Sequence, residues 1–207
     1  MTNKIANDEL RKRIDSHMRW LAGDKASGNQ LVLMDVLVSG ITLTEDNLSC
    51  AEFIRCRIEE SRFVKCDLSY SLLIDSVADG CSFLHCSLVK SDLRNARLSR
   101  ADFSGSDLTR ADLSRANLAY ANLKRAILSW AWLVETDLRF ANIEEARVEG
   151  TRFVKTKIFN TRQFHFGTLD RAVVTSVDSS PEGDGTEIGG VELLEALRDS
   201  SAQGRHH

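Results

Sequence analysis

The strongest constraint on the fold of this 207-residue chain is a period of five residues that runs unbroken from Leu33 to Ile158. Every fifth position in this range holds a large apolar residue, with Ala78 as the single exception. From Ala51 onward, the residue two places before each of these positions is always alanine, cysteine, serine or threonine. Amphipathic helices repeat an apolar residue every three or four positions and half-buried strands every second position, so neither explains the pattern. A fixed short period instead predicts stacked repeats that share one continuous core.

The five-residue unit also predicts the shape of one repeat. The small residue and the large residue can both point inward, which leaves three residues of each repeat on the outside. The chain then turns a corner every five residues, and the large side chains stack from one turn to the next. Each buried large side chain contributes roughly 1.5–3 kcal/mol before the entropy cost is subtracted. The only proline, Pro181, lies outside the periodic segment, where it removes no backbone hydrogen bond from the stack.

The repeat is clearest in residues 101–105 (ADFSG), 111–115 (ADLSR) and 116–120 (ANLAY). This A(D/N)LXX pattern resembles the pentapeptide-repeat family over about residues 31–160. The resemblance implies an all-β solenoid, namely a right-handed quadrilateral β-helix in which four repeats make one turn. The 26 repeats would then make about six and a half turns and a rod about 31 Å long, at ~4.8 Å per turn.

Composition and phase divide the chain into four segments. Residues 1–30 carry a net charge of +2 and are expected to form an N-terminal helical cap, and residues 31–165, with no net charge, form the β-helix. Residues 166–190 are rich in serine, glycine and acidic side chains, which predicts a flexible acidic linker. Residues 191–207 predict a short helix and a tail. Because Gln163 breaks the five-residue phase, we expect the rod to end by residue 165.

Both end segments contain an amphipathic pattern. Residues 8–21 predict a helix with Asn7 as its N-cap and Gly23 as its stop. Its apolar face consists of Leu10, Ile14, Met18 and Leu21. We expect this helix to cover the first turn as a lid, with a partner-binding helix as the alternative. The C-terminal helix is the candidate for docking on the last turn or for forming a homodimer, through Leu193, Leu194 and Leu197.

A few positions depart from the repeat and carry local predictions. Leu31, Val36 and Ile41 place large residues where small ones are the rule, so the first turn should be irregular and contact the cap. Asp46 occupies the same inward position, and we expect its carboxylate to accept backbone N–H groups. Ala78 predicts a kink, or a gap that a neighbouring side chain fills.

Signals for catalysis are nearly absent, so we expect no enzyme activity. His17, His85 and His165 are scattered, and none lies beside a nucleophile or carboxylate in an activating arrangement. Neither zinc-ligand spacing nor a phosphate-binding glycine motif occurs. We therefore expect no catalytic, cofactor or metal site. The aspartates that precede the large residues alternate with arginines, which predicts weak surface ion pairs.

Four of the five cysteines occupy the small inward position of the repeat. Reduced thiols that pack as small apolar residues are the favoured interpretation. Cys66 and Cys86 are twenty residues apart and would stack in adjacent turns, so a disulfide between them is the alternative. A cytoplasmic location opposes that disulfide.

The remaining information lies on the surface of the rod. Every twentieth residue falls in one column, which places Arg100, Tyr120 and Phe140 together. Tryptophan, tyrosine and arginine are the residues most enriched at binding hot spots. The candidate partner surface comprises Arg100, Tyr120, Phe140 and the nearby Phe159, with Trp130 and Trp132 along a different corner and face.

We therefore expect a non-enzymatic scaffold that binds a protein partner through its solenoid surface. The family resemblance implies an alternative, because some pentapeptide-repeat proteins mimic DNA, bind type II topoisomerases (DNA gyrase or topoisomerase IV) and protect them from quinolones or toxins. Such mimicry needs a dense negative surface, whereas each face of this rod mixes both signs. A bacterial effector delivered to a host cell is a third hypothesis that rests on the family alone.

Charge and hydropathy exclude other classes of partner. The arginines between residues 94 and 125 project from different faces and are interleaved with aspartates, so direct nucleic-acid binding is not expected. No run of 18 apolar residues occurs, which predicts no membrane span. Residues 1–13 are polar and do not resemble a classical signal peptide, so we expect a cytoplasmic protein.

Overall fold

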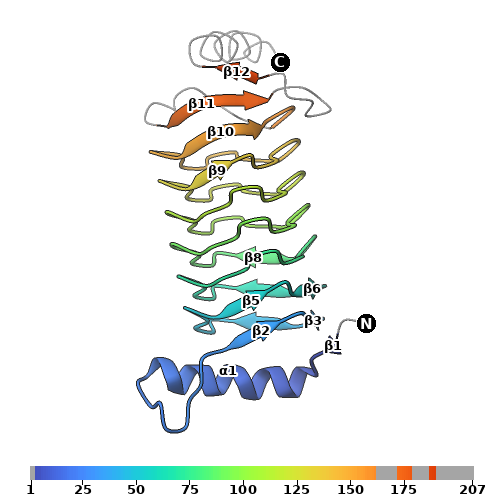
Figure 1. Ribbon diagram of the computed structural model, residues 1–207, viewed down its shortest axis with the longest axis vertical. Coiled ribbons are helices and arrows are strands. Elements are labelled where there is room, and N and C mark those ends of the chain that lie inside the picture. The colour runs from blue at the N-terminus through green and yellow to red at the C-terminus, as the bar shows by residue number, and fades with distance from the viewer. Residues whose placement is uncertain (1–2, 162–171, 179–186, 190–207) are drawn as a thin grey trace.

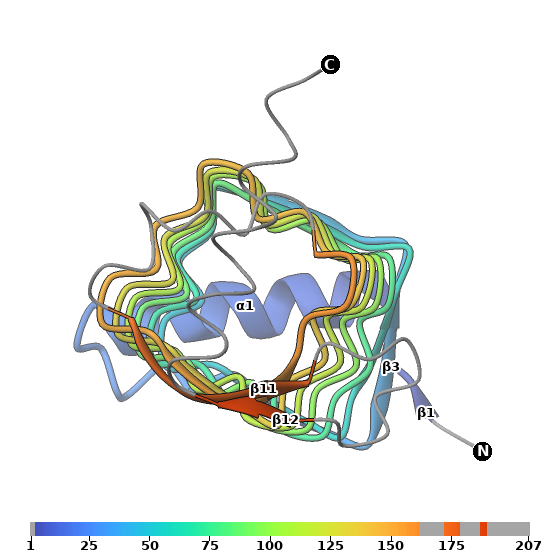
Figure 2. The same cartoon turned by 90° about the horizontal axis from the view of Figure 1, so that it is seen from above.

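The computed structural model describes residues 3–161, 172–178 and 187–189. They form a β-solenoid of about seven turns with one helix at its N-terminal end (Figure 1). Equivalent residues of adjacent turns lie twenty positions apart, as in the parallel bridges Asp102↔Asn122 and Asn122↔Asn142. Four repeats therefore make one turn, and the turns superimpose when the rod is viewed along its axis (Figure 2).

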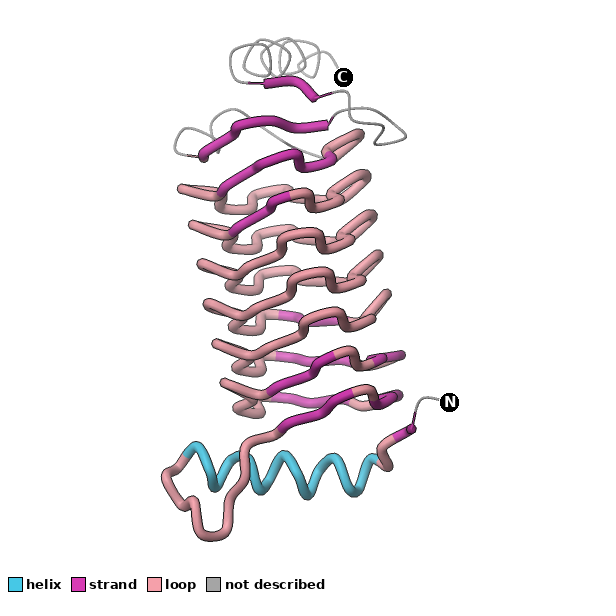
Figure 3. Tube along the Cα trace, viewed as in Figure 1, coloured by secondary structure: helices cyan, strands magenta, loops and turns pink. Residues whose placement is uncertain are grey.

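The strands are short because the chain turns a corner every five residues. In the stacked repeats they are β2 Val32–Met34, β3 Val36–Ser39, β4 Thr42–Thr44, β5 Glu52–Ile54, β6 Arg57–Glu59, β7 Arg62–Val64, β8 Ser82–Leu84 and β9 Trp132–Val134. Parallel pairing joins β2 to β5, β3 to β6, β4 to β7 and β7 to β8. Between β8 and β9 in the sequence, isolated parallel bridges keep the same spacing (Figure 3).

The fifth residue of each repeat forms the corner. Twenty-two residues other than glycine adopt a left-handed backbone there, with φ between 49° and 63°. This conformation costs roughly 1–2 kcal/mol for a residue with a Cβ. The aspartate or asparagine at the second position helps to hold the turn: Asp112 Oδ1 accepts a hydrogen bond from the Ser114 N–H at 2.9 Å. This Asx turn gives the A(D/N)LXX pattern a structural cause.

The aspartates therefore also hold the turn of the repeat, a role beyond the surface ion pairs that the sequence predicts. Asp92 and Asp137 do pair with arginines, Arg94 and Arg139, at 2.6 Å each. Both carboxylates also accept the backbone N–H two residues later, at 3.1 and 3.0 Å. The backbone bond recurs at the equivalent Asp and Asn residues that have no arginine beside them in sequence, such as Asn117, which accepts from Ala119.

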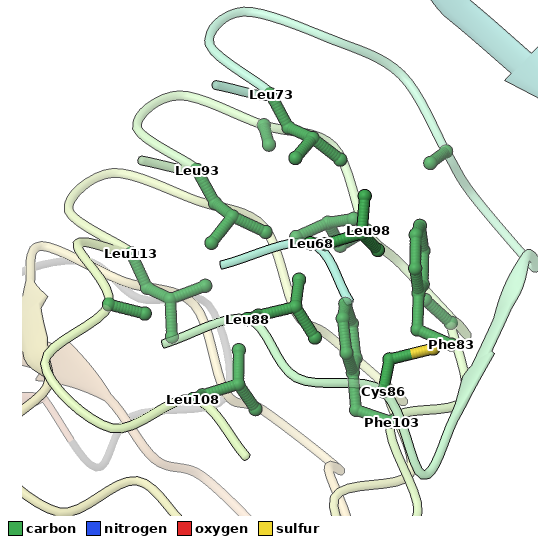
Figure 4. Close-up of a cluster of buried hydrophobic side chains, with 14 of the residues drawn as sticks. Leu68, Leu73, Phe83, Cys86, Leu88, Leu93, Leu98, Phe103, Leu108 and Leu113 are labelled. Atoms are coloured by element: carbon green, nitrogen blue, oxygen red, sulfur yellow. The ribbon is translucent and has the colours of Figure 1, made fainter. Parts of the chain in front are cut away.

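The large residues of the repeats form apolar columns through the rod. Phe63, Phe83 and Phe103 stack ring on ring with centroids 4.9 Å apart at both steps. Leucines such as Leu93 and Leu113 form a second column (Figure 4). Ala78 is buried and its N–H donates to the Arg97 carbonyl at 2.8 Å, so the ladder is regular there. The kink that the sequence allowed at Ala78 is therefore wrong.

The chain enters the stack through an extended segment. β1 (Asn3–Lys4) pairs with β3, and the Ile5 N–H donates to the Leu37 carbonyl at 3.0 Å. The helix α1 (Asn7–Leu21) follows, with Ala6 as its N-cap and no side-chain capping bond. The prediction of Asn7 as the N-cap is wrong, because the pairing of β1 fixes where the extended chain ends. Gly23, with φ 90°, follows the end of the helix.

The buried face of α1 also differs from the predicted one. Leu10, Ile14 and His17 are buried, whereas Met18 is 41 % exposed. The predicted position of Met18 on the buried face is therefore wrong. Leu10 and Ile14 border a hollow whose other wall includes Ile41, so α1 covers one side of the first turn.

Polar contacts of Arg11, Arg13 and His17 tie the N-terminal segment to the stack, and Arg13 Nη2 donates to the Val32 carbonyl at 2.8 Å. His17 Nδ1 accepts the Leu31 N–H at 3.0 Å, and His17 Nε2 lies 3.0 Å from the Ser49 carbonyl oxygen. The ring must therefore carry its proton on Nε2 and be neutral. Asp46 accepts Arg11 at 2.7 Å and also the Thr44 N–H at 3.2 Å, which confirms the expected backbone bond of Asp46.

The C-terminal end extends beyond the periodic repeats. β10 (Arg152–Lys157) pairs in parallel with β9 and with β11 (Val173–Asp178), and β12 (Glu187–Gly189) adds an antiparallel strand. Val177 is fully buried, and Ile158 N–H donates to the Asp178 carbonyl at 2.8 Å.

Residues 173–178 are therefore not part of a flexible linker, and the rod does not end at residue 165. A valine-rich stretch here pairs with β10 through an irregular register, which needs no five-residue phase. The phase break at Gln163 and the C-terminal helix expected from Leu193, Leu194 and Leu197 lie outside the described residues.

Candidate functional site

The six candidate surface residues fall into two groups on opposite corners of the rod. Arg100, Tyr120 and Phe140 are fifth-position residues of successive turns. Trp130 is also a fifth-position residue, but ten positions from Tyr120, which is half of the twenty-residue turn. The two corners are therefore diagonally opposite, and one flat partner surface cannot contact both.

We call Arg100, Tyr120, Phe140 and Phe159 the aromatic ladder. The Arg100 guanidinium lies 5.6 Å from the centre of the Tyr120 ring. The Tyr120 and Phe140 rings stack at 4.7 Å with their planes 6° apart, and Phe159 meets Phe140 edge-on at 5.5 Å. Tyr120 is 52 % exposed, so the ladder presents one open ring that its neighbours hold in place from both sides.

A shallow hollow of about 350 Å³ lies beside the ladder. Its lining includes the rings of Tyr120 and Phe140 and the amides of Asn122, Asn142 and Asn160. Sequence reasoning missed Asn122 and Asn142 because asparagine at the second position also serves the turn: Asn142 Oδ1 accepts the Glu144 N–H at 3.1 Å. Only their alignment with the ladder, every twentieth residue, could have indicated them.

The tryptophans lie on and beside a different side of the rod. We call this side face 1, and its central residues are Leu33, Phe53, Leu73, Leu93, Leu113, Leu133 and Phe153. Trp132 projects from face 1, and the Arg152 guanidinium lies 4.9 Å from the centre of its ring. Trp130, at the corner that precedes face 1, covers Gly150, where a Cβ would lie 2.6 Å from the indole ring.

Sequence reasoning also missed two exposed side chains of this region. Met34 and Tyr70 are among the large apolar residues that remain exposed. Tyr70 is a fifth-position residue on the corner of Trp130, and Lys90 of the next turn lies over its ring at 5.1 Å. Reading the sequence in columns of twenty would have found both residues.

The charges of the rod are paired between turns. Arg55 bonds Asp35 at 2.7 Å, Arg115 bonds Glu135 at 3.0 Å, and Lys124 bonds Glu144 at 2.8 Å. Arg125 likewise holds Glu145, and this hydrogen-bonded guanidinium lowers the pKa of the Glu145 carboxyl below its ordinary value. Each of these pairs joins residues twenty positions apart and opposite in sign, so no face of the described rod carries a continuous negative surface.

The described residues offer no metal site, since no three His, Cys, Asp or Glu side chains among them are arranged to hold an ion. All five cysteines are free thiols. Cys86 interacts with Cys66 of the preceding turn, and this contact and burial raise the pKa of the Cys86 thiol, which keeps it protonated. The helix of the described chain is too short and too polar to cross a membrane.

Comparison with protein families decides what the repeat is. Residues 46–123 match the pentapeptide repeat region, and residues 121–158 match the model of eight pentapeptide repeats, so together they cover more than half of the chain. The chain is a pentapeptide-repeat protein. No curated protein is significantly similar to this pentapeptide-repeat protein over its sequence.

Several solved structures are similar to this chain at low identity. HetL, a pentapeptide repeat protein involved in heterocyst differentiation regulation in the cyanobacterium Nostoc sp. strain PCC 7120, is 22 % identical, with 77 % of each chain covered and a TM-score of 0.38. QnrB1, a plasmid-mediated fluoroquinolone resistance protein, is 16 % identical over 72 % of this chain and 92 % of its own, with a TM-score of 0.41. A pentapeptide repeat protein from the thylakoid lumen of Arabidopsis thaliana is 23 % identical over 57 % of this chain and 82 % of its own, with a TM-score of 0.44.

Proposed function

We propose that this protein is a non-enzymatic cytoplasmic scaffold that binds a protein partner along the aromatic ladder. The observation that carries the proposal is the exposed Tyr120 ring, which Arg100 holds on one side and Phe140 on the other. Aromatic and arginine side chains dominate binding energy when they fill a pocket on a partner.

The rigidity of the ladder favours binding. Arg100, Tyr120 and Phe140 project from corners whose backbone is fixed by hydrogen bonds to the next turn, as in Tyr120 N–H to the Arg139 carbonyl at 2.9 Å. Side chains that are already ordered lose little conformational entropy when a partner binds, so more of the contact energy appears as affinity. The amides in the adjacent hollow add hydrogen-bonding groups beside the rings.

The topoisomerase alternative has less support from the charges. A DNA mimic would present rows of unpaired carboxylates, whereas Glu135 and Glu145 are each bonded to an arginine of the adjacent turn. We therefore expect the protein to change neither gyrase supercoiling nor ciprofloxacin-induced cleavage. Protection of gyrase at low micromolar concentration would reverse the order of the two hypotheses.

Site-specific photo-crosslinking tests the ladder directly. A photoreactive phenylalanine analogue at position 120 is compared with the same analogue at position 70, because Tyr120 and Tyr70 are equally exposed fifth-position tyrosines on different corners. We expect the probe at position 120, and not at position 70, to capture one other protein from native extract. We also expect a Phe140→Ser substitution to abolish that capture.

Equal capture from both positions, or capture that survives Phe140→Ser, would contradict the proposed site. A thermal melt of each labelled protein serves as the control for folding.

A further inference from the structure

The apolar surface of this rod is concentrated on face 1. Among the residues that flank the centre of each repeat, large apolar side chains number eight on face 1 but only three, two and two on the other sides. Those of face 1 are Val32, Met34, Ile54, Leu72, Ile74, Trp132, Val134 and Val154. These residues form two apolar patches, one on turns one to three and one on turns six and seven, with Asp92, Arg94, Asp112 and Ser114 between them. Exposed apolar patches of this kind mark interaction sites.

Exposure points to the same side. Six large apolar side chains of the described chain are exposed, and four of them lie on face 1 or on the corner that precedes it. These four are Met34, Tyr70, Trp130 and Trp132. Face 1 therefore presents both the rows of half-buried aliphatic residues and most of the open rings of the rod.

We propose that face 1 binds face 1 of a second copy of this chain, with the two rods antiparallel. The two-fold axis lies across the rods at the turn that contains Asn95. Such an axis places the first turn opposite the seventh, the second opposite the sixth and the third opposite the fifth, and it leaves each column opposite itself. An isologous interface requires this self-complementarity.

The charges beside face 1 support the antiparallel arrangement. The corner that follows face 1 holds one column of seven residues, called here the charged corner: Asp35, Arg55, Asp75, Asn95, Arg115, Glu135 and Lys155. The sign of the charge inverts about Asn95. The proposed axis therefore sets Asp35 opposite Lys155, Arg55 opposite Glu135, and Asp75 opposite Arg115.

This complementarity distinguishes the proposed arrangement from its parallel counterpart. In a parallel pair the charged corner would lie along the opposite edge of face 1, beside the column of Tyr70 and Trp130. Asp75 would then meet Tyr70, and Arg55 would meet Cys50, so these charges would have no oppositely charged residue across the interface. Complementary charge of this kind sets register and excludes wrong arrangements.

The fourth-position column of face 1 fits the same axis, whereas the second-position column sets Val32 opposite Arg152, Glu52 opposite Trp132 and Leu72 opposite Asp112. Along face 1, Ile54 lies opposite Val134 and Met34 opposite Val154, so apolar residues meet at both ends of the interface. On the corner that precedes face 1, the axis sets the exposed Tyr70 ring opposite the Arg110 guanidinium. An arginine over a tyrosine face is a favourable cation–π contact.

Near the two-fold axis, each residue lies opposite the same residue of the second copy. Arg94 and Asp92 form a bidentate pair, with Arg94 Nε 2.9 Å from Oδ1 and Nη2 2.6 Å from Oδ2 of Asp92. The two charges therefore meet the second copy as a neutral unit. Face 1 and its two corners present four columns of seven residues, 28 in all, which matches the 20–30 residues that each side contributes to a stable interface.

Sedimentation velocity over a concentration series of the full chain tests whether the dimer forms. We expect a monomer–dimer equilibrium whose dissociation constant rises at least about tenfold in Met34→Ser/Trp132→Ser, since these exposed residues lie at the two ends of face 1. Tyr120→Ser, an equally exposed ring on the aromatic ladder, should leave the equilibrium unchanged. A chain that stays monomeric at hundreds of micromolar, or a dimer that only Tyr120→Ser weakens, would overturn the proposal.

A charge swap tests the antiparallel register. Asp75→Arg alone and Arg115→Asp alone each set like charges opposite one another and should weaken the dimer. The double variant Asp75→Arg/Arg115→Asp restores both contacts across the axis and should recover most of the wild-type affinity. Circular dichroism melts control for folding. If the double variant loses as much dimer affinity as the two single variants lose together, the proposed register is wrong. If a different protein binds face 1 of a monomer, self-association is wrong.

Discussion

At His17, one buried imidazole satisfies two backbone groups from different parts of the chain. Its Nδ1 accepts the Leu31 N–H and its Nε2–H donates to the Ser49 carbonyl, both at 3.0 Å. His17→Ala leaves a buried donor and a buried acceptor without their partner, which should cost about 1–3 kcal/mol of unfolding free energy at pH 8. Urea unfolding measures this loss. His85→Asn, at an exposed histidine, is the control and should stay within about 0.5 kcal/mol of the wild type.

The same histidine makes stability depend on pH. Burial favours the neutral ring, so the pKa of His17 in the folded protein lies below the ordinary histidine value of about 6.5. The unfolded chain then binds more protons as the pH falls. The contribution of His17 is fully present above about pH 6.5 and is lost as the pH drops toward and through the folded-state pKa. Unfolding free energies between pH 8 and pH 5 should fall less in His17→Ala than in the wild type, and equal slopes would contradict this assignment.

Gly150 and Gly80 form a natural pair for a second residue-scale prediction. Both have a left-handed backbone, with φ 67° and 70°, but a Cβ on Gly150 would collide with the Trp130 ring while a Cβ on Gly80 would meet nothing within 4 Å. Gly80→Ala should therefore lower the free energy of unfolding by at most about 2 kcal/mol, which is the cost of a left-handed backbone for a residue with a Cβ. Gly150→Ala should cost more and displace the indole. Tryptophan fluorescence reports the displacement, and an identical spectrum in the two variants would refute the stacking of Trp130 on Gly150.

Single side chains show why the corners were only partly predictable. The alternation of Asp112 with Arg115 in the sequence suggested ion pairs, yet Asp112 bonds the Ser114 backbone and Arg115 reaches Glu135 in the next turn. Local sequence gives the first bond through the known habit of aspartate in turns. The second depends on which residues lie twenty positions apart, and that spacing follows only once the number of repeats per turn is fixed.

At the scale of elements, α1 depends on two aliphatic residues for its packing. Ile14 is buried against the first turn, whereas Met18 on the adjacent side is 41 % exposed. Ile14→Ala should destabilise the N-terminal segment by about 2–5 kcal/mol, and Met18→Ala should change stability by no more than about 0.5 kcal/mol. Hydrogen exchange of the α1 amides measures both. Equal loss of protection in the two variants would favour the face that the sequence alone predicts.

The elements at both ends were harder to predict than the repeats between them. Heptad-like spacing placed Met18 on the buried face of α1, but the helix is rotated so that His17 reaches the backbone of the first turn. The acidic, glycine-rich surroundings of β11 predict a linker there. Its pairing with β10 is a tertiary contact, supported by the buried Val177, and no local pattern reports it.

For the whole molecule, the sequence was sufficient for the architecture and insufficient for the surfaces. A five-residue period with one inward leucine or phenylalanine forces a stack, whatever the identity of the outward residues. The outward residues gain meaning only in columns: Tyr120 belongs with Phe140, and Trp132 belongs with Met34 at the far end of the same face. The two separate surfaces agree with the sequence prediction that Trp130 and Trp132 lie along a different corner and face from Tyr120.

A solenoid in which each turn contacts only its neighbours predicts that damage depends on position along the rod. Leu113 is fully buried at the middle of the stack, between Leu93 and Leu133 of the adjacent turns, and Leu113→Asp places an unpaired charge there. This variant should show no cooperative unfolding transition, because it separates the rod into two short stacks. The volume-conserving Leu113→Met is the matched control and should cost less than about 1.5 kcal/mol.

Ile143 is the last buried member of its column in the described chain, so Ile143→Asp damages only the C-terminal turns. The turns before Ile143 keep their neighbouring turns on both sides. Their stability comes from contacts between adjacent turns, and this substitution leaves those contacts intact. Hydrogen exchange should therefore show native protection for residues 31–120 in Ile143→Asp, whereas Leu113→Asp should lose protection in the turns around residue 113 and lower it in the two short stacks on either side. Global loss of protection in both variants would mean that the rod folds as one indivisible unit rather than as a row of coupled turns.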